Sequence, residues 1–125
     1  MTVLFDTTIL IDILRGHPGA VGFAGRLDET PACSEISRVE VMRGLRSSER
    51  TNAERLLQAC RWVAVNEDIA RRAGELGRSY RRSHPGLSTA DLVIGATALE
   101  VGADLATQNV KHFPMFRGLR PPYRG

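Results

Sequence analysis

Short apolar runs alternate with longer segments of helical periodicity along the chain. The run at 3–5 is continuously apolar and ends at Asp6, which is typical of a strand buried on both faces of a sheet. Ile36, Val39 and Met42 are instead spaced by three, as on one face of a helix. Runs of the first kind predict strands at 3–5, 30–33, 62–65 and 105–107. Segments of the second kind predict helices at 9–14, 18–27, 34–48, 49–60, 67–82 and 88–101.

Glycine residues mark the ends of several of these segments. Gly16 and Gly102 follow the first and the last predicted helix, at the position where glycine most often ends one. Strands that alternate with helices predict a parallel sheet with helices on its faces. Because no repeat or low-complexity linker interrupts the pattern, the sequence predicts one α/β domain over residues 1–125, with a tail containing proline and arginine from Phe113 onward.

The composition agrees with one folded domain and excludes several classes of protein. The 125 residues are enough for one core, and 42% apolar with 25% charged residues is an ordinary globular mixture. No apolar run reaches the ~18 residues of a membrane span, and the amino terminus lacks the pattern of a signal peptide. Cys33 and Cys60 form no C-x-x-C motif, so we expect two small apolar side chains in a reducing cytoplasm rather than a zinc or redox site.

The charge balance admits a polyanionic partner. The net charge is +3, and Lys111 is the only lysine among the 17 basic residues, the others being arginine. A small positive excess is compatible with nucleic-acid binding without demonstrating it. The dominance of arginine therefore has two explanations that stay open here, phosphate recognition and codon usage.

Three carboxylates stand at positions where a parallel α/β sheet binds ligands. Asp6 directly follows the first strand, and Glu40 and Asp91 lie near the starts of two helices. Asn109 follows the last strand. Each of these residues also has a purely structural explanation. Asp6 can cap the following helix, Glu40 and Asp91 match the pattern of a capping box, and asparagine is common in turns. Glu40 could also form an ion pair on the helix surface with Arg43, three residues later.

Taken together, these residues predict a metal site. The carboxyl ends of parallel strands and the starts of the following helices meet at one edge of the sheet, where ligands bind. Three carboxylates in one place repel one another and need a counter-charge to remain ionised. A hard divalent cation supplies that charge, and Mg²⁺ keeps several waters when it binds one or two carboxylates. Such a site suits metal-assisted hydrolysis of phosphodiester bonds.

Other phosphate and nucleotide chemistries lack their motifs. An aspartyl-phosphate phosphatase needs Asp-x-Asp after the first strand, but the second of those positions is Thr8 here. Neither the G-x-x-x-x-G-K loop of phosphate-binding ATPases nor the G-x-G-x-x-G turn of dinucleotide-binding folds is present. These three classes are therefore excluded.

The chain contains four segments, in order, that match a known family: 3–8, 37–44, 88–98 and 105–113. They resemble the PIN-domain ribonucleases, and most closely the VapC toxins of bacterial type II toxin–antitoxin modules. The resemblance covers essentially the whole chain and implies one PIN-like three-layer domain over residues 1–125, with a short parallel sheet of four to five strands flanked by helices. It also implies a cytoplasmic endoribonuclease with a Mg²⁺ or Mn²⁺ cofactor, a VapB-like antitoxin partner and a homodimer.

The resemblance also implies roles for individual residues. Asp6, Glu40 and Asp91 match the metal-binding and catalytic acids of the family, and Thr7 matches a hydroxyl that helps to arrange the site. The fourth acidic position of the family, often Asp, is Asn109 here. Its amide oxygen can coordinate a metal but adds no charge, so a second ion would be held more weakly. We therefore expect Asp6 and Asp91 to hold a divalent ion, with Glu40 orienting it or the attacking water.

The contacts with RNA and with a protein partner are less defined by the sequence. Arg71, Arg78 and Arg82 lie on one face of a predicted helix and could clamp phosphates, although a solvated helix surface explains the same spacing. Apolar positions of the first helix and of the helix that carries Glu40 could line a groove for an antitoxin helix, or pack in the core. The alternative to an active enzyme is a catalytically silent PIN-like module that binds RNA or protein, which Asn109 makes plausible.

Overall fold

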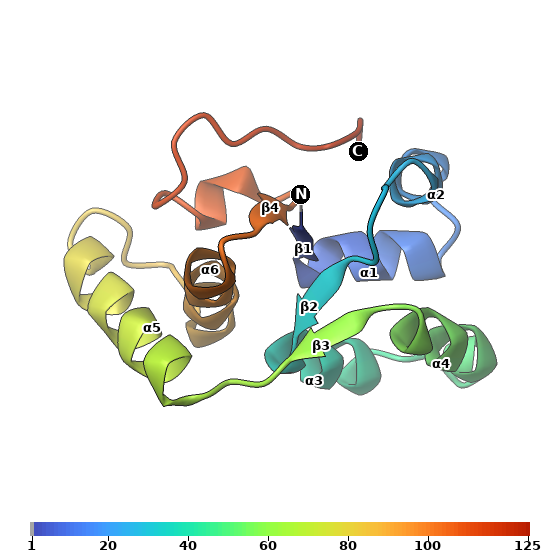
Figure 1. Cartoon of the computed structure of the whole chain (residues 1–125), viewed down its shortest axis with the longest axis horizontal. Coiled ribbons are helices and arrows are strands. Elements are labelled where there is room, and N and C mark those ends of the chain that lie inside the picture. Colours follow the sequence, from blue (N-terminus) through green and yellow to red (C-terminus); the bar gives the residue numbers. More distant parts are fainter. Residues whose placement is uncertain (1) are drawn as a thin grey trace.

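Four short strands form the centre of the protein. In the computed structural model, which describes residues 2–125, they are β1 (Val3–Phe5), β2 (Ala32–Ser34), β3 (Arg61–Val63) and β4 (Asp104–Ala106). Neighbouring strands are parallel, in the order β3-β2-β1-β4 (Figure 1). The prediction of an α/β fold with a short parallel sheet is therefore confirmed.

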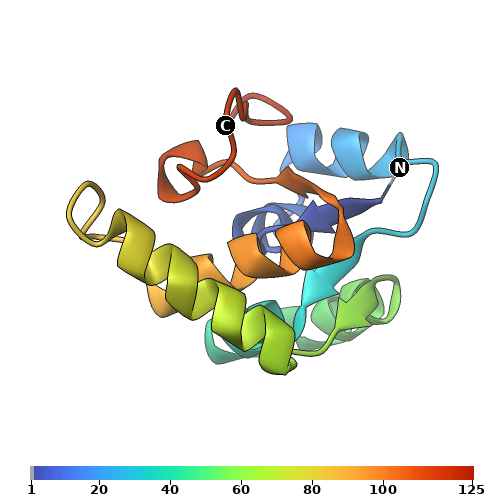
Figure 2. The ribbon, with the colours of Figure 1, turned by 60° about the vertical axis from the view of Figure 1, so that its left-hand side comes forward.

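Six α-helices surround the sheet in residues 2–125. They are α1 (Thr7–Leu14), α2 (Pro18–Gly25), α3 (Glu35–Arg43), α4 (Arg50–Gln58), α5 (Glu67–Tyr80) and α6 (Thr89–Val101). The same part of the chain contains two 3₁₀ turns, η1 (Ser47–Glu49) and η2 (Val110–His112). Helices α1, α2 and α4 cover one face of the sheet and α6 covers the other, with α5 packed outside α6 (Figure 2). None of the helices in residues 2–125 combines the length and apolar character needed to span a membrane.

Strand β1 is buried on both of its faces, as its continuous apolar run predicts. Consecutive side chains of a strand point to opposite faces. Phe5 packs into one core cluster with Ile9 of α1, and Leu4 packs into the other with Ile94 of α6. Leu4 is 0% exposed and Phe5 is 1% exposed. The residue that follows, Asp6, is thereby fixed between the two helical layers at the edge of the sheet.

Helix α3 begins at a different cap from the one that the sequence suggested. Ser34, the last residue of β2, caps α3 by accepting a hydrogen bond from Ile36 N on its Oγ (3.2 Å). Ser37 and Glu40 therefore form no capping box, and that structural explanation of Glu40 is wrong. Both residues lie at interior positions of α3, so their side chains are available for contacts with another element.

Helix α3 also ends earlier than the predicted helix at 34–48. The chain leaves the helix after Arg43, and Glu49 Oε1 accepts a hydrogen bond from Arg46 N (3.0 Å) at the start of η1. This local side-chain bond offers the backbone an alternative to the helix, which the spacing of apolar residues does not reveal. The other strands and α-helices begin and end within two residues of the predicted ranges.

The segment after residue 112 is packed onto the core, so the prediction of a tail is wrong. Phe113 is 0% exposed in the core cluster on the α6 face, and Phe116 and Leu119 pack against that cluster. Tyr123 packs against the opposite cluster, and its Oη donates a hydrogen bond to Asp12 Oδ2 (2.7 Å). Proline and glycine interrupt the segment and conceal the apolar positions that the core uses.

The Tyr123 hydroxyl is expected to stabilise this packing. Tyr123→Phe should lower the free energy of unfolding by about 1–2 kcal/mol, because Asp12 loses a donor while the ring keeps its contacts. Urea unfolding at neutral pH measures the change. Tyr80→Phe is the matched control, since the Tyr80 hydroxyl has no hydrogen bond within residues 2–125. Equal losses in the two variants would contradict a stabilising bond to Asp12.

Candidate active site

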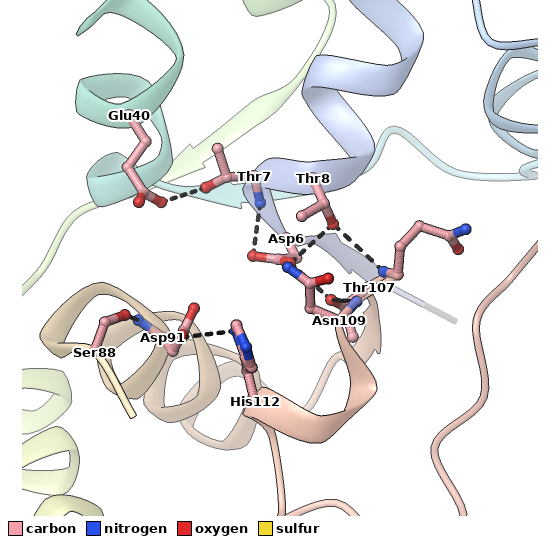
Figure 3. A network of polar contacts seen from close by, with 10 residues as sticks. Asp6, Thr7, Thr8, Glu40, Ser88, Asp91, Thr107, Asn109 and His112 are labelled. Carbon is pink, nitrogen blue, oxygen red and sulfur yellow. Dashed lines mark hydrogen bonds and ion pairs between the residues drawn. The ribbon is translucent and has the colours of Figure 1, made fainter. Parts of the chain in front are cut away.

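A cleft of about 480 Å³ lies at the carboxyl edge of the sheet. Its lining includes the residues that the sequence places in the site: Asp6, Thr7, Glu40, Asp91 and Asn109. They come from separate elements around one space (Figure 3). Strands β1 and β4 are parallel neighbours, so their carboxyl ends lie side by side and bring distant parts of the chain together.

Asp6 is the most enclosed carboxylate of the cleft. It is 3% exposed and accepts hydrogen bonds from Thr7 N on Oδ1 (2.8 Å), and on Oδ2 from Thr8 Oγ1 (2.9 Å) and Thr107 Oγ1 (2.7 Å) (Figure 3). The bond from Thr7 N also makes Asp6 the cap of α1. The Asp6 carboxylate therefore caps α1 and also lines the cleft, so the structural and the functional explanation of this residue both hold.

The surroundings of Asp6 raise its pKa above the usual value. Burial is the largest cause, the three hydrogen bonds oppose it, and the negative charge of Asp91 adds to it. The ionised carboxylate is thus held in a place where it is disfavoured and where another carboxylate repels it. A cation bound in the cleft would offset both effects.

Thr7 links the first helix to Glu40. Thr7 Oγ1 donates a hydrogen bond to Glu40 Oε1 (2.6 Å) and lies 2.9 Å from Ser37 Oγ. Ser37 is fully buried, so this contact holds α3 against the start of α1. The bond orients the Glu40 carboxylate and leaves its second oxygen available to the cleft (Figure 3).

Asp91 is held at the start of α6. Ser88 caps this helix by accepting a hydrogen bond from Asp91 N on its Oγ (3.1 Å), which leaves the Asp91 side chain out of the cap. Asp91 Oδ2 instead lies 3.2 Å from His112 Nδ1 (Figure 3). Asn109, in the same loop as His112, donates from its backbone N to Thr107 Oγ1 (2.9 Å), the hydroxyl that contacts Asp6.

The three arginines predicted to contact RNA do not line the cleft. Arg71, Arg78 and Arg82 lie on α5 or just beyond it, and α5 packs on the outer side of α6 (Figure 2). The basic side chains that do line it are Arg43 and His112, which the sequence analysis did not place in the site. The position of His112, three residues after Asn109 in one loop, is the sequence signal that could have found it.

The donor set fits a divalent ion that keeps most of its waters. Within residues 2–125, no group of three His, Cys, Asp or Glu side chains is arranged to hold a metal ion directly. Mg²⁺ needs only one or two carboxylates and retains several waters. Asp6 and Asp91 are close enough for the charge of one to raise the pKa of the other. These two carboxylates can share such an ion, and carboxylate, amide and water oxygens are its preferred ligands.

Comparisons with known proteins agree with this geometry. The family model described as "PIN domain" matches residues 3–114. The solved structure of a toxin–antitoxin complex from Klebsiella pneumoniae has a similar chain, with a TM-score of 0.83 and 31% sequence identity over 97% of this chain and 98% of that one. The PIN-like fold is therefore shared along almost the entire length of both chains.

Two curated relatives from Mycobacterium tuberculosis are more similar in sequence. Ribonuclease VapC19 is 49% identical over 123 residues, which cover 96% of this chain and 98% of the relative. Ribonuclease VapC10 is 43% identical over 123 residues, covering 97% of this chain and 92% of the relative. Identities of this size over nearly the full length show that the chain belongs to the VapC family of PIN-domain ribonuclease toxins.

Proposed function

We propose that the protein hydrolyses phosphodiester bonds of RNA in the cleft between β1, α3 and α6, with the help of Mg²⁺ or Mn²⁺. The observation that carries the proposal is the meeting of Asp6, Glu40 and Asp91 in one cleft from three separate elements. The names of the two mycobacterial relatives support the same activity. A toxin of this kind acts in the cytoplasm, where its RNA substrates are.

The side chains divide the work according to their positions. Asp6 and Asp91 would hold the ion, and the hydroxyls of Thr8 and Thr107 keep the Asp6 oxygens fixed. When bound, the ion lowers the pKa of a coordinated water and stabilises charge on the leaving oxygen. Glu40, oriented by Thr7, accepts a hydrogen bond from the attacking water and aligns it with the phosphate. The His112 ring, whose Nδ1 lies 3.2 Å from Asp91 Oδ2, holds that carboxylate toward the cleft.

A defined cleavage assay tests this proposal. The purified protein should cleave a pool of labelled single-stranded RNAs with Mg²⁺ or Mn²⁺, and cleavage should stop when a chelator is added. A preparation of Asp91→Asn, purified in the same way, should leave the RNA intact and so exclude a contaminating nuclease. Binding of RNA without cleavage under every metal condition would favour the catalytically silent module instead.

Asn109 is expected to limit how tightly the site holds a divalent ion. Asn109→Asp adds a negative charge to the cleft lining, so the Mg²⁺ concentration for half-maximal cleavage should fall several-fold, or by about 1 kcal/mol in binding free energy. Metal titrations of the cleavage rate measure this midpoint. Asn109→Ser keeps an oxygen but adds no charge and should not lower the midpoint. A midpoint unchanged in Asn109→Asp would show that this position lies outside the metal's reach.

We also propose that the chain forms a homodimer and binds a VapB-like antitoxin. The similar chain from Klebsiella pneumoniae belongs to a toxin–antitoxin complex. Helix α3 exposes Val39 (58%) and Met42 (46%), and Met42 and Leu45 line a second cleft of about 210 Å³. Ile9 is fully buried and belongs to the core, so the first helix contributes less to a groove than the sequence suggested. Light scattering should give about twice the 13.7 kDa chain mass, and a cognate antitoxin should suppress cleavage.

A further inference from the structure

Arg43 is the one charged residue of the cleft lining, within residues 2–125, to which the proposed mechanism gives no role. It lies in the last turn of α3, three residues after Glu40, and its side chain is exposed. Three carboxylates share the same lining, yet Arg43 forms no ion pair in the part of the chain that the structure describes. A guanidinium that has no carboxylate partner keeps its charge-assisted donors for a ligand.

The cleft carboxylates are already engaged elsewhere. Thr7 holds one oxygen of Glu40, His112 contacts Asp91, and three donors bind Asp6. A divalent ion would engage the remaining oxygens further. Arg43 thus lines the cleft without a carboxylate partner, and its donors are available to a ligand that enters.

Two arginines near α3, Arg38 and Arg15, are occupied by contacts within the protein. Arg38, on the same helix, donates to Glu35 Oε1 (2.6 Å), and its guanidinium lies 4.2 Å from the ring centre of Trp62. Arg15 pairs with Glu49 (3.3 Å). Arg43 therefore differs from these arginines in two respects, since it lines the acidic cleft and has no partner there.

The walls beside Arg43 leave room for a polymer. Gly44 follows it on the lining and Gly86 lies on the lining as well, and neither has a side chain to cover the guanidinium. A guanidinium presents five N–H donors in a planar fork that matches two oxygens of a phosphate. An RNA backbone offers such a phosphate at every nucleotide.

We propose that Arg43 is the substrate-phosphate contact of this site, binding non-bridging oxygens of the RNA backbone phosphate that lies in the cleft. This inference rests on the proposed ribonuclease function and adds the residue that holds the substrate while the acids hold the ion. It differs from the contact predicted on α5, because Arg71, Arg78 and Arg82 do not line the cleft. Those three arginines could contact only RNA phosphates that lie outside the cleft.

The test compares Arg43→Gln and Arg43→Lys with Arg55→Gln. Arg55 is exposed on α4, lies outside the cleft lining and gives the same loss of charge. Each variant is assayed for cleavage, and each is also combined with Asp6→Asn so that binding of a fluorescent single-stranded RNA can be followed by anisotropy without cleavage. Thermal melting of every variant checks that the fold is retained.

Arg43→Gln should raise KM and weaken RNA binding by about tenfold, and it should lower the slope of log K against log salt by about one between roughly 50 and 200 mM. Arg43→Lys should retain part of the binding, because it keeps the charge and loses the fork. Arg55→Gln should stay within about twofold of the parent protein. The Mg²⁺ midpoint should not change in Arg43→Lys or Arg55→Gln, whereas Arg43→Gln removes a positive charge from the cleft lining and should lower the midpoint slightly.

Two outcomes would overturn the inference while leaving the ribonuclease function intact. One is a parent protein that cleaves RNA together with an Arg43→Gln variant that matches Arg55→Gln in KM, binding and salt slope. The other is a shifted Mg²⁺ midpoint in Arg43→Lys, which keeps the charge, because that shift would mean that Arg43 acts on the ion and not on the phosphate. If the parent protein neither binds nor cleaves RNA, the proposed function itself fails, whatever the variants do.

Discussion

Asp6→Asn is expected to lower the rate of RNA cleavage by at least about a hundredfold, or roughly 3 kcal/mol in the transition-state barrier. The substitution keeps the size of the side chain and removes the negative charge that would bind the ion. Asp6 is 3% exposed and lines the cleft, so the charge is lost at the place where the ion would bind. Single-turnover cleavage of a defined RNA at saturating Mg²⁺ measures the effect. A variant that still cleaves at more than a tenth of the parent rate would remove Asp6 from the catalytic site.

The same substitution should not destabilise the fold, which separates a catalytic effect from unfolding. Burial raises the pKa of Asp6, so its ionised form costs stability at neutral pH. Asn109 and the threonines can remain in place, because the hydroxyls of Thr8 and Thr107 can accept from the new amide instead of donating. In a chelator, Asp6→Asn should therefore melt at the same temperature as the parent protein or higher.

The sign of this effect gives a pH dependence. A carboxyl whose folded pKa lies above its unfolded value destabilises the folded state at high pH, and the penalty disappears as the pH falls through the folded pKa. The melting advantage of Asp6→Asn should thus be largest near pH 7 and should shrink on acidification toward about pH 4. Added Mg²⁺ should raise the melting temperature of the parent protein more than that of the variant. A variant that melts well below its parent in the chelator would contradict this account.

The site could be anticipated from the sequence because the carboxyl ends of parallel strands lie at one edge of the sheet. Asp6 directly follows a strand that is apolar at every position, and Asn109 comes shortly after another, so a parallel sheet places both at one edge. Asp91 lies in the first turn of a helix that is apolar on most sides, which indicates burial of that helix against the sheet. These relations depend on periodicity and order alone, and both are visible in a sequence.

The contacts within the site depend on the directions of individual side chains, which the spacing of apolar residues in the sequence does not predict. Ser37 reads as a cap in the sequence, but Ser34 takes that place and Ser37 turns toward Thr7. Whether an arginine faces a cleft or solvent is also a matter of helix rotation. For this reason the sequence suggested Arg43 only as a surface partner of Glu40, whereas it lines the cleft and forms no ion pair with Glu40 in residues 2–125. The start of α3 depends on a local hydrogen bond, from Ile36 N to Ser34 Oγ. The side chains that face the cleft depend on how each helix is rotated about its axis.

Phe113 is expected to connect the stability of the fold with the geometry of the site. Its ring is 0% exposed and packs with Leu4 and Ile94, and its backbone N donates to Val110 O (3.1 Å), which closes η2. This turn carries His112 and follows Asn109, so the ring fixes one wall of the cleft from behind. The apolar core is close-packed beside this ring, since a methyl group at Gly95 would come within 3.3 Å of Met115 Sδ, which is tighter than an ordinary contact.

Phe113→Ala should lower the free energy of unfolding by about 3–5 kcal/mol, because it leaves a cavity that the closely packed neighbours cannot fill. Urea unfolding measures this loss, and Phe116→Ala, at a partly buried ring of the same segment, should cost about half as much or less. Cleavage by Phe113→Ala, measured well below its melting temperature, should also fall while RNA binding outside the cleft persists, since His112 and Asn109 lose their support. Equal losses of stability in the two variants, or full activity in Phe113→Ala, would show that η2 is held by its own hydrogen bonds and not by the core.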